Sequence, residues 1–308
     1  MAINDSSSSK TTDQRRKYIL DFVKENPETP LSFDDVQQQF GKLSPQTLHN
    51  DARYFRQQGA PVSVASRRFI YDLVHSNSLE TRRNRNVAKK KAIAVAVAKL
   101  VSGDLALQTR HETPNRLQEK LNSISRQSSR LIALDAGSTC EQVCKAICEL
   151  KTPARNLKSI SFVTNSLSIS NLIHLSSSKH RLFLIGGKVR GGTDVICGTL
   201  AERSFESMGV FPDIAIVGVT STNQLSVFTC SHEDEAAMKR QILGKSNIRA
   251  VVVDSTKLLD SSRAASWEFA TIYHDIDLVF TNEISGDESI RDEIIRVVSG
   301  SGAAIVFC

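Results

Sequence analysis

The chain has 308 residues, of which 40% are hydrophobic and 23% charged, and its formal net charge is +6. This composition is typical of a globular protein, and the length is sufficient for two domains. No apolar run approaches the roughly 20 residues of a membrane span, and the polar, serine-rich residues 1–12 lack the apolar core of a secretion signal. We therefore expect a cytoplasmic protein, with residues 1–12 as a disordered tail, rather than a membrane-embedded or secreted one.

The positive charge is concentrated in the N-terminal third of the chain. Residues 1–91 carry 16 Lys and Arg against 10 Asp and Glu, a net charge of +6, whereas residues 92–308 carry 23 of each kind. This asymmetry favours a basic nucleic-acid-binding module joined to a neutral domain. A solvated basic face is the alternative, since it gives the same count.

Residues 13–75 predict three helices followed by a hairpin. The first helix has an apolar stripe of Ile19, Phe22 and Val23 at helical spacing. A short second helix is predicted over residues 33–40, where apolar residues again recur at helical intervals.

A third helix is predicted from Ser44 and Pro45 to residue 58, because serine caps helices and proline suits their first position. Its apolar residues share one side, and polar side chains that can read base edges share the other. A short helix, a turn and such a third helix predict a helix-turn-helix; a three-helix protein-interaction module with a solvated face is the alternative. The residues of this helix expected to contact DNA are Ser44, Gln46, Thr47, His49, Asn50 and Arg53.

Two short strands, residues 62–64 and 69–71, flank a pair of arginines and predict the wing of a winged helix. Arginines in a wing suit contacts with DNA phosphates, and so do two arginines near the start of the first helix. Residues 76–91 are basic and contain few apolar side chains, so we expect a linker there. The arginines expected to contact phosphates are Arg15, Arg16, Arg67 and Arg68.

Residues 92–308 are expected to form a second domain of the α/β class. Strands of continuous apolar sequence alternate with helices, which favours a mostly parallel sheet covered on both faces. Ligands of such sheets bind at the carboxyl ends of the strands. The predicted strands are residues 131–134, 159–164, 181–185, 214–219, 250–253, 278–280 and 303–307.

The sequence Asp135-Ala136-Gly137-Ser138-Thr139 follows the first of these strands and precedes a helix. Gly137 permits a tight turn, and the hydroxyl groups and free N–H groups of a helix start can hold an anion. The motif therefore predicts a phosphate-binding loop, with an ordinary helix cap as the alternative.

Comparable residues follow the other strands. Thr164-Asn165-Ser166, Gly186-Gly187-Lys188-Val189-Arg190 and Asp254-Ser255-Thr256-Lys257 each follow a predicted strand, and Gly218 lies within the end of another. Glycines, hydroxyls, an amide and cations gathered at one edge of a sheet suit a phosphorylated sugar or polyol.

The cysteines do not indicate a metal site. Cys140, Cys144 and Cys148 recur every four residues on one predicted helix, but zinc requires a fourth ligand of suitable geometry. Val143 and Ile147 flank the same stripe, so cysteine is expected to serve there as a small core residue. We expect reduced thiols, no metal and no cofactor.

With these motifs in place, residues 15–308 resemble a DeoR-family transcriptional regulator. The resemblance rests on several short motifs rather than on one. They are Arg15-Arg16 with Ile19, Ser44-Pro45-Gln46-Thr47-Leu48, Asp135-Ala136-Gly137-Ser138-Thr139, Val163-Thr164-Asn165-Ser166-Leu167, Gly186-Gly187-Lys188-Val189-Arg190, Glu235-Ala236-Ala237-Met238-Lys239, Asp254-Ser255-Thr256-Lys257, and Asp275-Ile276-Asp277 followed by Thr281-Asn282.

The resemblance implies a non-enzymatic regulator, usually a repressor of sugar or carbon metabolism genes. It implies a winged helix that binds operator DNA and a C-terminal domain, related to sugar-phosphate isomerases, that senses a phosphorylated sugar or polyol. It also implies a homo-oligomer, dimer or tetramer, in the cytoplasm and associated with the bacterial nucleoid when bound to DNA. The implied effector site, together with the strand-end residues above, comprises Asp135, Gly137, Ser138, Thr139, Thr164, Asn165, Gly186, Gly187, Arg190, Glu235, Lys239 and Lys257.

The chain departs from the family pattern in three places. His49 and Asn50 stand where the recognition helix usually has two arginines, which is expected to alter the operator sequence. Residues 105–130 form a polar insert, for which a lid, an oligomerisation arm and disorder are alternatives. Residues 224–229 replace a usual Gly-Leu-Thr-Thr-like stretch, which leaves the effector open.

Two other functions remain open at this point. A sugar-phosphate isomerase would use Glu235 as the base and Lys257 as the electrophile, although an isomerase has no need of a winged helix. A co-regulator that acts through protein contacts is the other alternative, because two recognition arginines are absent.

Overall fold

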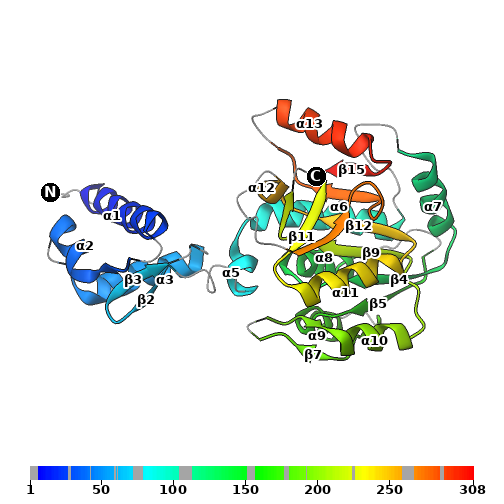
Figure 1. Ribbon diagram of the computed structural model, residues 1–308, viewed down its shortest axis with the longest axis horizontal. Helices are drawn as coiled ribbons and strands as arrows, with labels where there is room; N and C mark the ends of the chain where they lie inside the picture. The colour runs from blue at the N-terminus through cyan, green and yellow to red at the C-terminus, as the bar shows by residue number, and fades with distance from the viewer. Residues whose placement is uncertain are drawn as a thin grey trace. The chain divides into compact units, whose positions relative to one another are not determined.

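The computed structural model divides the chain into two compact units, Met1–Arg85 and Asn86–Cys308 (Figure 1). It describes residues 6–26, 29–41, 43–58, 60, 62–71, 79–103, 113–150, 157–176, 180–191, 193–223, 226–258, 267–284 and 288–308. Residues 76–91, expected to be a linker, include helix α5 (Leu79–Asn84) and the first turn of helix α6 (Val87–Ser102). The boundaries predicted at residues 75 and 91 therefore stay an expectation.

The N-terminal unit has the order of elements expected of a winged helix. A three-stranded antiparallel sheet, in the order β1-β3-β2, lies against the helices. Strand β1, only two residues long, was not predicted. The elements are α1 (Ser6–Glu25), β1 (Leu31–Ser32), α2 (Phe33–Phe40), α3 (Pro45–Gln58), β2 (Val62–Ala65), β3 (Arg68–Tyr71) and α5.

Helix α1 begins earlier than predicted. It starts at Ser6, so the described part of the tail expected at residues 1–12 is helical. A helix already held by its packed residues extends readily, because each added residue forms one more hydrogen bond. Ile19 and Val23 of this helix are fully or almost fully buried, as the apolar stripe predicts.

The wing is a hairpin with a two-residue turn. Ala65 pairs with Arg68, and the turn residues Ser66 and Arg67 both have positive φ, 49° and 59°. Two positive φ values are typical of a type I′ turn, whose twist matches that of the strands. Glycine or asparagine would adopt this conformation at lower cost than serine and arginine do.

Helices α1 and α3 are joined by a buried ion-pair cluster. Asp51 of α3 accepts hydrogen bonds from Arg15 Nε at 2.6 Å and from Arg16 Nε at 2.8 Å. The Arg15 side chain is only 5% exposed. The expectation that Arg15 contacts DNA phosphates is therefore corrected: this arginine neutralises a carboxylate inside the unit.

The C-terminal unit is the α/β domain that the sequence predicts. Strands and helices alternate along most of it, and each predicted strand is present within one or two residues. Its elements are α6, α7 (Asn115–Ser125), β4 (Ser129–Leu134), α8 (Ser138–Cys148), β5 (Ser159–Thr164), α9 (Leu167–Leu175), β6 (Arg181–Leu184), β7 (Lys188–Val189), β8 (Ile196–Cys197), α10 (Thr199–Ser207), β9 (Ile214–Gly218), β10 (Ser221–Asn223), β11 (Val227–Cys230), α11 (Glu233–Gly244), β12 (Ile248–Val252), α12 (Ser255–Leu258), β13 (Trp267–Thr271), β14 (Leu278–Thr281), α13 (Glu288–Ser299) and β15 (Ala304–Phe307).

A seven-stranded parallel sheet forms the centre of this unit. Its order is β15-β14-β12-β9-β4-β5-β6, and every pairing is parallel. The chain begins the sheet at β4, builds β5 and β6 on one side, and then returns to add β9 on the other. The direction of building thus reverses between β4 and β9, and such a reversal opens a crevice at the carboxyl ends of the two strands.

Both faces of the sheet are covered, which explains why its strands are apolar throughout. In β9, Ile214 and Ile216 pack under α6, α7, α8 and α9, whereas Ala215 and Val217 pack under α10, α11 and α13 (Figure 1). Alternate residues of a strand point to opposite faces, so a strand buried on both sides must be apolar at every position.

The insert at residues 105–130 includes an ordinary element of the α/β layer. Helix α7 buries Leu117, Leu121 and Ile124 against the sheet, and Lys120 Nζ lies 2.9 Å from Asp277 Oδ1. Although burial opposes ionisation, Arg249 and Lys120 lower the pKa of Asp277. The described part of the insert is therefore neither a lid nor disordered; residues 104–112 lie outside the described residues.

Two small antiparallel sheets lie beside the main one. The sheet β10-β11-β13 includes residues 227–229 of the segment that departs from the family pattern, and β7 pairs with β8 after the double glycine. These pairings were not predicted, because two- and three-residue strands have too little alternation to be recognised.

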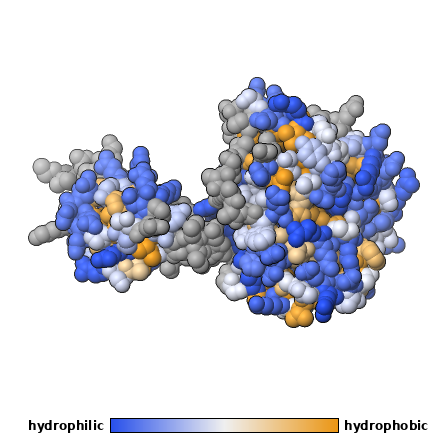
Figure 2. Space-filling model, in the orientation of Figure 1, coloured by the Kyte–Doolittle hydropathy of each residue, from blue (hydrophilic) through white to orange (hydrophobic). Residues whose placement is uncertain are grey.

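The exposed surface is mainly hydrophilic on the face drawn in Figure 2, with hydrophobic residues in scattered patches. Leu175, Leu200 and Phe211 are the most exposed of the large apolar side chains in the described residues. Within the described part of the chain, no helix combines the length and apolar character that crossing a membrane requires.

We predict that Asp51→Ala destabilises the protein by about 3–5 kcal/mol, because it leaves the buried Arg15 without a partner. Chemical denaturation followed by the fluorescence of the tyrosines on α1, α3 and β3 measures the loss. Asp21→Ala, at an exposed position of α1, is the control and is expected to change stability by no more than about 0.5 kcal/mol. Equal effects of the two variants would contradict the structural role of Asp51.

Candidate functional site

A buried ion pair lies where β4 and β9 diverge. Asp135 directly follows β4 and is 1% exposed, and Lys239 of α11 forms an ion pair with its Oδ2 atom. The backbone N–H of Gly218, at the end of β9, donates to the same oxygen at 3.1 Å. Lys239 Nζ also donates to the Gly218 carbonyl at 3.0 Å. Asp135 thus joins β4, β9 and α11.

The ion pair keeps Lys239 charged despite its burial. Burial alone favours the neutral amine, but the carboxylates of Asp135 and Glu235 raise the pKa of Lys239 above the ordinary lysine value. Lys239 therefore stays protonated at neutral pH and remains paired with Asp135.

The loop after β4 is also fixed from the β5 side. Asn165 accepts a hydrogen bond from the Ala136 N–H at 3.1 Å, and its amide lies 3.4 Å from Asp135 Oδ1. Thr164 donates to the Leu134 carbonyl at 2.6 Å. Asn165 and Thr164, predicted as effector-binding residues, are 1% and 0% exposed. They position the loop rather than line an open surface.

Helix α8 begins at this loop. Gly137 is its N-cap with φ 137° and ψ 157°, and no side chain caps the helix there. The first hydrogen bond of the helix runs from the Glu141 N–H to the Gly137 carbonyl at 2.9 Å. The N–H groups of the three preceding residues have no acceptor within the helix. Ser138 and Thr139 are each 5% exposed.

Two cations with partly exposed side chains follow strands of the unit: Arg190 comes directly after β7, and Lys257 lies in α12, the short helix after β12. Arg190 Nη2 is 2.7 Å from Glu235 Oε1, and its side chain is 26% exposed. Lys257 Nζ donates to the Val219 carbonyl at 2.8 Å and is 3.8 Å from Asp254 Oδ2, with 21% exposure. These two side chains, unlike Lys239, can reach a ligand without breaking a fully buried ion pair.

The double glycine after β6 has a packing role. A Cβ atom on Gly187 would lie 2.9 Å from the Ala201 backbone nitrogen, and Gly187 has φ +149°. Gly186 donates its N–H to Ser204 Oγ at 3.0 Å. The close approach of α10 explains why residue 187 has no side chain; the expectation that these glycines bind a ligand stays a prediction.

The structure brings the predicted effector residues to one edge of the sheet, in two groups. Asp135, Thr164, Asn165 and Lys239 form a buried network that shapes the edge. The second group comprises Gly137, Ser138, Thr139, Gly186, Gly187, Arg190, Glu235 and Lys257, which lie in the loops and at the helix starts around that network. Free helix N–H groups and two accessible cations can hold a phosphoryl group.

The polar side of α3 is ordered by hydrogen bonds between its own side chains. Asn50 Oδ1 accepts from Gln46 Nε2 at 3.2 Å and lies 3.4 Å from Arg53 Nη1, and all three residues are exposed. Ser44 and Thr47 cap the helix: Ser44 Oγ accepts from the Thr47 N–H at 3.1 Å. The ladder Gln46–Asn50–Arg53 is thus a prearranged polar surface.

Further cations lie elsewhere in the N-terminal unit. Arg16 lies over the Tyr54 ring at 3.8 Å from its centroid, with a quarter of its side chain exposed. Arg67 is 62% exposed and 3.8 Å from Asp34, and Arg68 is exposed on β3. His49 packs edge-on against Phe33 with its ring centroid 5.2 Å away.

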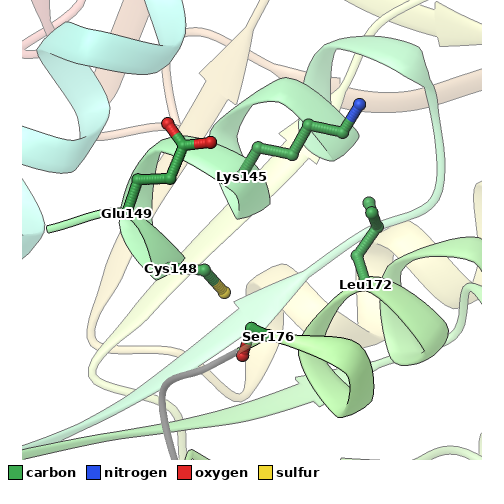
Figure 3. Close-up of a pocket in the computed structure, with 5 residues that line it drawn as sticks. All are labelled: Lys145, Cys148, Glu149, Leu172 and Ser176. Atoms are coloured by element: carbon green, nitrogen blue, oxygen red, sulfur yellow. The ribbon is translucent and has the colours of Figure 1, made fainter.

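A separate pocket lies at the other end of α8 from the strand-end loops. It is lined by Lys145, Cys148, Glu149, Leu172 and Ser176, from the ends of α8 and α9 (Figure 3). In Figure 3 the sulfur of Cys148 points toward the hydroxyl of Ser176.

The pKa of the Cys148 thiol is lowered by the groups around it. The nearby Cys144 thiol and His180 imidazole outweigh the effect of burial and hold the pKa of Cys148 below the ordinary cysteine value. Burial raises the pKa of Cys308 to about 12 and also raises that of Cys140.

Cys140 and Cys144 are fully buried in the core, as their helical stripe predicts. No cluster of three or more metal-ligating His, Cys, Asp or Glu side chains occurs in the part of the chain that the structure describes.

Three functional or structural partnerships were missed in the sequence. Asp51 lies between Leu48 and Phe55 on the apolar stripe of α3, and an acid on such a stripe is a signal for a buried cation. The pairing of Cys148 with His180 joins positions 32 residues apart and has no local signal. The third, between Asn86 and Asp254, spans most of the C-terminal unit.

Comparisons with known proteins match the C-terminal unit. A family model described as the DeoR C terminal sensor domain matches residues 126–283, just over half of the chain. No curated protein matches the sequence.

Similar solved structures include ribose 5-phosphate isomerase A from Methanocaldococcus jannaschii, at 12% identity and TM-score 0.34 over 56% of this chain and 54% of that chain. The ribose 5-phosphate isomerase from Plasmodium falciparum has 15% identity and TM-score 0.30 over 46% and 51%. A putative 6-phosphogluconolactonase from Neisseria gonorrhoeae has 8% identity and TM-score 0.31 over 55% and 81%. The chain spans about half the length of these isomerases, and likenesses this low carry no argument about function.

We predict that iodoacetamide alkylates Cys148 faster than Cys308 at pH 6.5, because the pKa of Cys148 is lowered and burial raises that of Cys308. Peptide mass spectrometry reads each cysteine separately. Cys308, the other partly exposed cysteine, is the internal control and should remain unmodified at pH 6.5; faster labelling of Cys308 would contradict the assignment.

Proposed function

Because the chain belongs to the family defined by the DeoR C-terminal sensor domain, we propose that it is a DNA-binding transcriptional regulator. In this proposal it is a repressor, its N-terminal unit binds operator DNA, and a phosphorylated sugar or polyol bound by the sensor domain controls the affinity. We also propose that it acts in the cytoplasm as a homo-oligomer, associated with the nucleoid when bound to DNA.

The ladder Gln46–Asn50–Arg53 is the observation that carries the DNA-binding proposal. Amide and guanidinium groups are the side chains that pair with adenine and guanine edges in the major groove. In the ladder, Asn50 holds its two neighbours by hydrogen bonds, so less side-chain freedom is lost when DNA binds. The ladder supports sequence-specific binding although His49 and Asn50 replace the usual arginines.

Arg67 supports a wing that contacts the phosphate backbone. It occupies a left-handed backbone position, φ 59°, which costs a non-glycine residue roughly 1–2 kcal/mol. Residues kept in such positions often have a functional side chain. An exposed cation at the tip of a hairpin suits a DNA phosphate.

The sensor part of the proposal rests on Arg190, Lys257 and the start of α8. Each cation is partly exposed and follows a strand at the carboxyl edge of the sheet. The N–H groups of the first turn of α8 add the positive end of a helix dipole. Glu235 and Asp254 neutralise these cations while no anion is bound, and an incoming phosphoryl group would compete with them.

We predict that selection from a random duplex pool enriches one sequence, and that the protein binds this sequence more tightly than random DNA by a factor of at least about 10³. Asn50→Ala and Arg53→Ala should each weaken binding to the enriched sequence by about 1–3 kcal/mol and leave random DNA binding unchanged. Arg67→Ala should weaken binding to the enriched sequence and to random DNA alike. It should also reduce the slope of log affinity against log salt concentration by about 1. Fluorescence anisotropy in a salt series measures all of these.

Arg203→Ala, an exposed arginine of α10, is the matched control. Adding phosphorylated pentoses and hexoses in turn should change the affinity for the enriched sequence by roughly 5–150-fold for one of them. Failure to enrich any sequence would overturn the regulator proposal. Retained repression in the Asn50→Ala/Arg53→Ala double variant would favour action through protein contacts. Isomerisation of a sugar phosphate that Glu235→Gln abolishes would favour an enzyme.

A further inference from the structure

Asn86, the first residue of the C-terminal unit, has an unusual conformation. It precedes α6 with φ 53° and ψ 38°, a left-handed position, and its side chain does not cap the helix. Asparagine tolerates this conformation better than most residues when its side chain is hydrogen-bonded. The backbone carbonyl of Asn86 accepts the Lys90 N–H at 3.1 Å, so this residue fixes the start of α6.

The side chain of Asn86 reaches the loop after β12. Its Nδ2 atom donates to Asp254 Oδ1 at 3.2 Å and to Thr256 Oγ1 at 3.1 Å. Lys89, one turn along, donates to Ser255 Oγ at 3.2 Å. The first turn of α6 is therefore held by three consecutive residues of one strand-end loop.

Lys257 belongs to the same segment, in the short helix α12 that directly follows Asp254. Asp254 is 1% exposed. Its Oδ1 atom accepts hydrogen bonds from Asn86 and from the Thr256 hydroxyl, and its Oδ2 atom lies 3.8 Å from Lys257 Nζ. Lys257 in turn donates to the carbonyl of Val219, the residue after Gly218. Gly218 is bonded to Asp135. A chain of contacts thus runs from the start of α6 to the buried ion pair of Asp135 and Lys239.

We propose that Asn86 is a positioning residue that couples the state of the strand-end site to the start of α6, where the chain leaves the DNA-binding unit. This inference rests on the proposed function, because it assigns the contacts through which a bound anion changes the structure outside the sensor site. When a phosphoryl group binds Lys257, the ammonium group interacts with the phosphoryl oxygens, and its interaction with Asp254 becomes weaker. The Asp254 carboxylate then relies more on the Asn86 amide and on the Thr256 hydroxyl, which itself accepts from Asn86, and this tightens the first turn of α6.

Two features make Asn86 suited to this role. Asp254 is buried, so water cannot replace a lost interaction with one of its partners, and its other partners must bind it more strongly instead. Asn86 is also bonded at both ends, by its side chain to the loop and by its carbonyl to α6. Glycine adopts the same backbone without strain but lacks the amide, so Asn86→Gly removes the coupling while it preserves the turn.

The test is amide hydrogen exchange of the full chain with inorganic phosphate as the probe. Phosphate is titrated until the loop amides 136–141 give a dissociation constant, and exchange is then compared at about ten times that concentration. Binding that is linked to an opening slows exchange by about 11-fold at this concentration. In the wild type, both the loop amides and amides 90–93 of α6 should slow by about that factor.

In Asn86→Gly the loop amides should still slow by about 11-fold, whereas amides 90–93 should slow by less than about twofold. Asn171→Ala, an exposed asparagine of α9, is the matched control and should behave as the wild type. Equal slowing of amides 90–93 in Asn86→Gly and wild type would overturn the coupling role. Slowing of the loop amides alone in the wild type would also overturn it, and would leave the sensor site intact. If phosphate slows neither set in the wild type, the proposed sensor function fails, and the coupling fails with it.

Discussion

The buried ion pair between Asp135 and Lys239 is the interaction on which the arrangement of the sensor site depends. It lies where the order of strands reverses, and it joins the end of β4, the end of β9 and helix α11. Removing two charges from water is costly, and the cost is recovered only when both are well paired and hydrogen-bonded. Here Gly218 and Asn165 supply the additional hydrogen bonds, so the loops on both sides are held in one geometry.

This ion pair divides the site into a fixed interior and an adjustable rim. The charged groups of Asp135 and Lys239 are paired with each other inside the protein. Arg190 and Lys257 are partly exposed, and each faces a carboxylate that an anion can replace. The division suits the proposed sensor role, because the interior ion pair is buried while the cations of the rim have carboxylate partners that an anion could displace. It also explains why the rim loops, rather than the centre, connect to the start of α6.

The sequence was sufficient to predict the elements whose signals are local. Continuous apolar strands such as 159–164 and 214–219 predicted a doubly covered parallel sheet, because only such a sheet buries every position of a strand. The Ser44-Pro45 start predicted α3, and Leu48 and Phe55 predicted its buried face. The gathering of strand-end motifs at one edge followed from the rule for parallel sheets.

What could not be predicted depends on pairings between distant residues. Asp51 is a buried partner of Arg15, and this pairing converts an expected DNA contact into a structural one. Gly187 is explained by the approach of Ala201, which no local pattern reveals. Helix α7 was not predicted, because its three buried residues stand among many polar ones. The role of Asn86 depends on Asp254, which lies 168 positions away in the sequence.

Calorimetric titration of the full chain with phosphorylated pentoses and hexoses tests the central claim most directly, because it needs no DNA. The account predicts that one of these ligands binds, and that Lys257→Met weakens it by about 10- to 150-fold, the loss expected when a hydrogen bond to a charged group is removed. Lys245→Met, at the far end of α11 from Glu235, should bind as the wild type does. Unchanged affinity in Lys257→Met, or no binding of any phosphorylated sugar, would contradict the account.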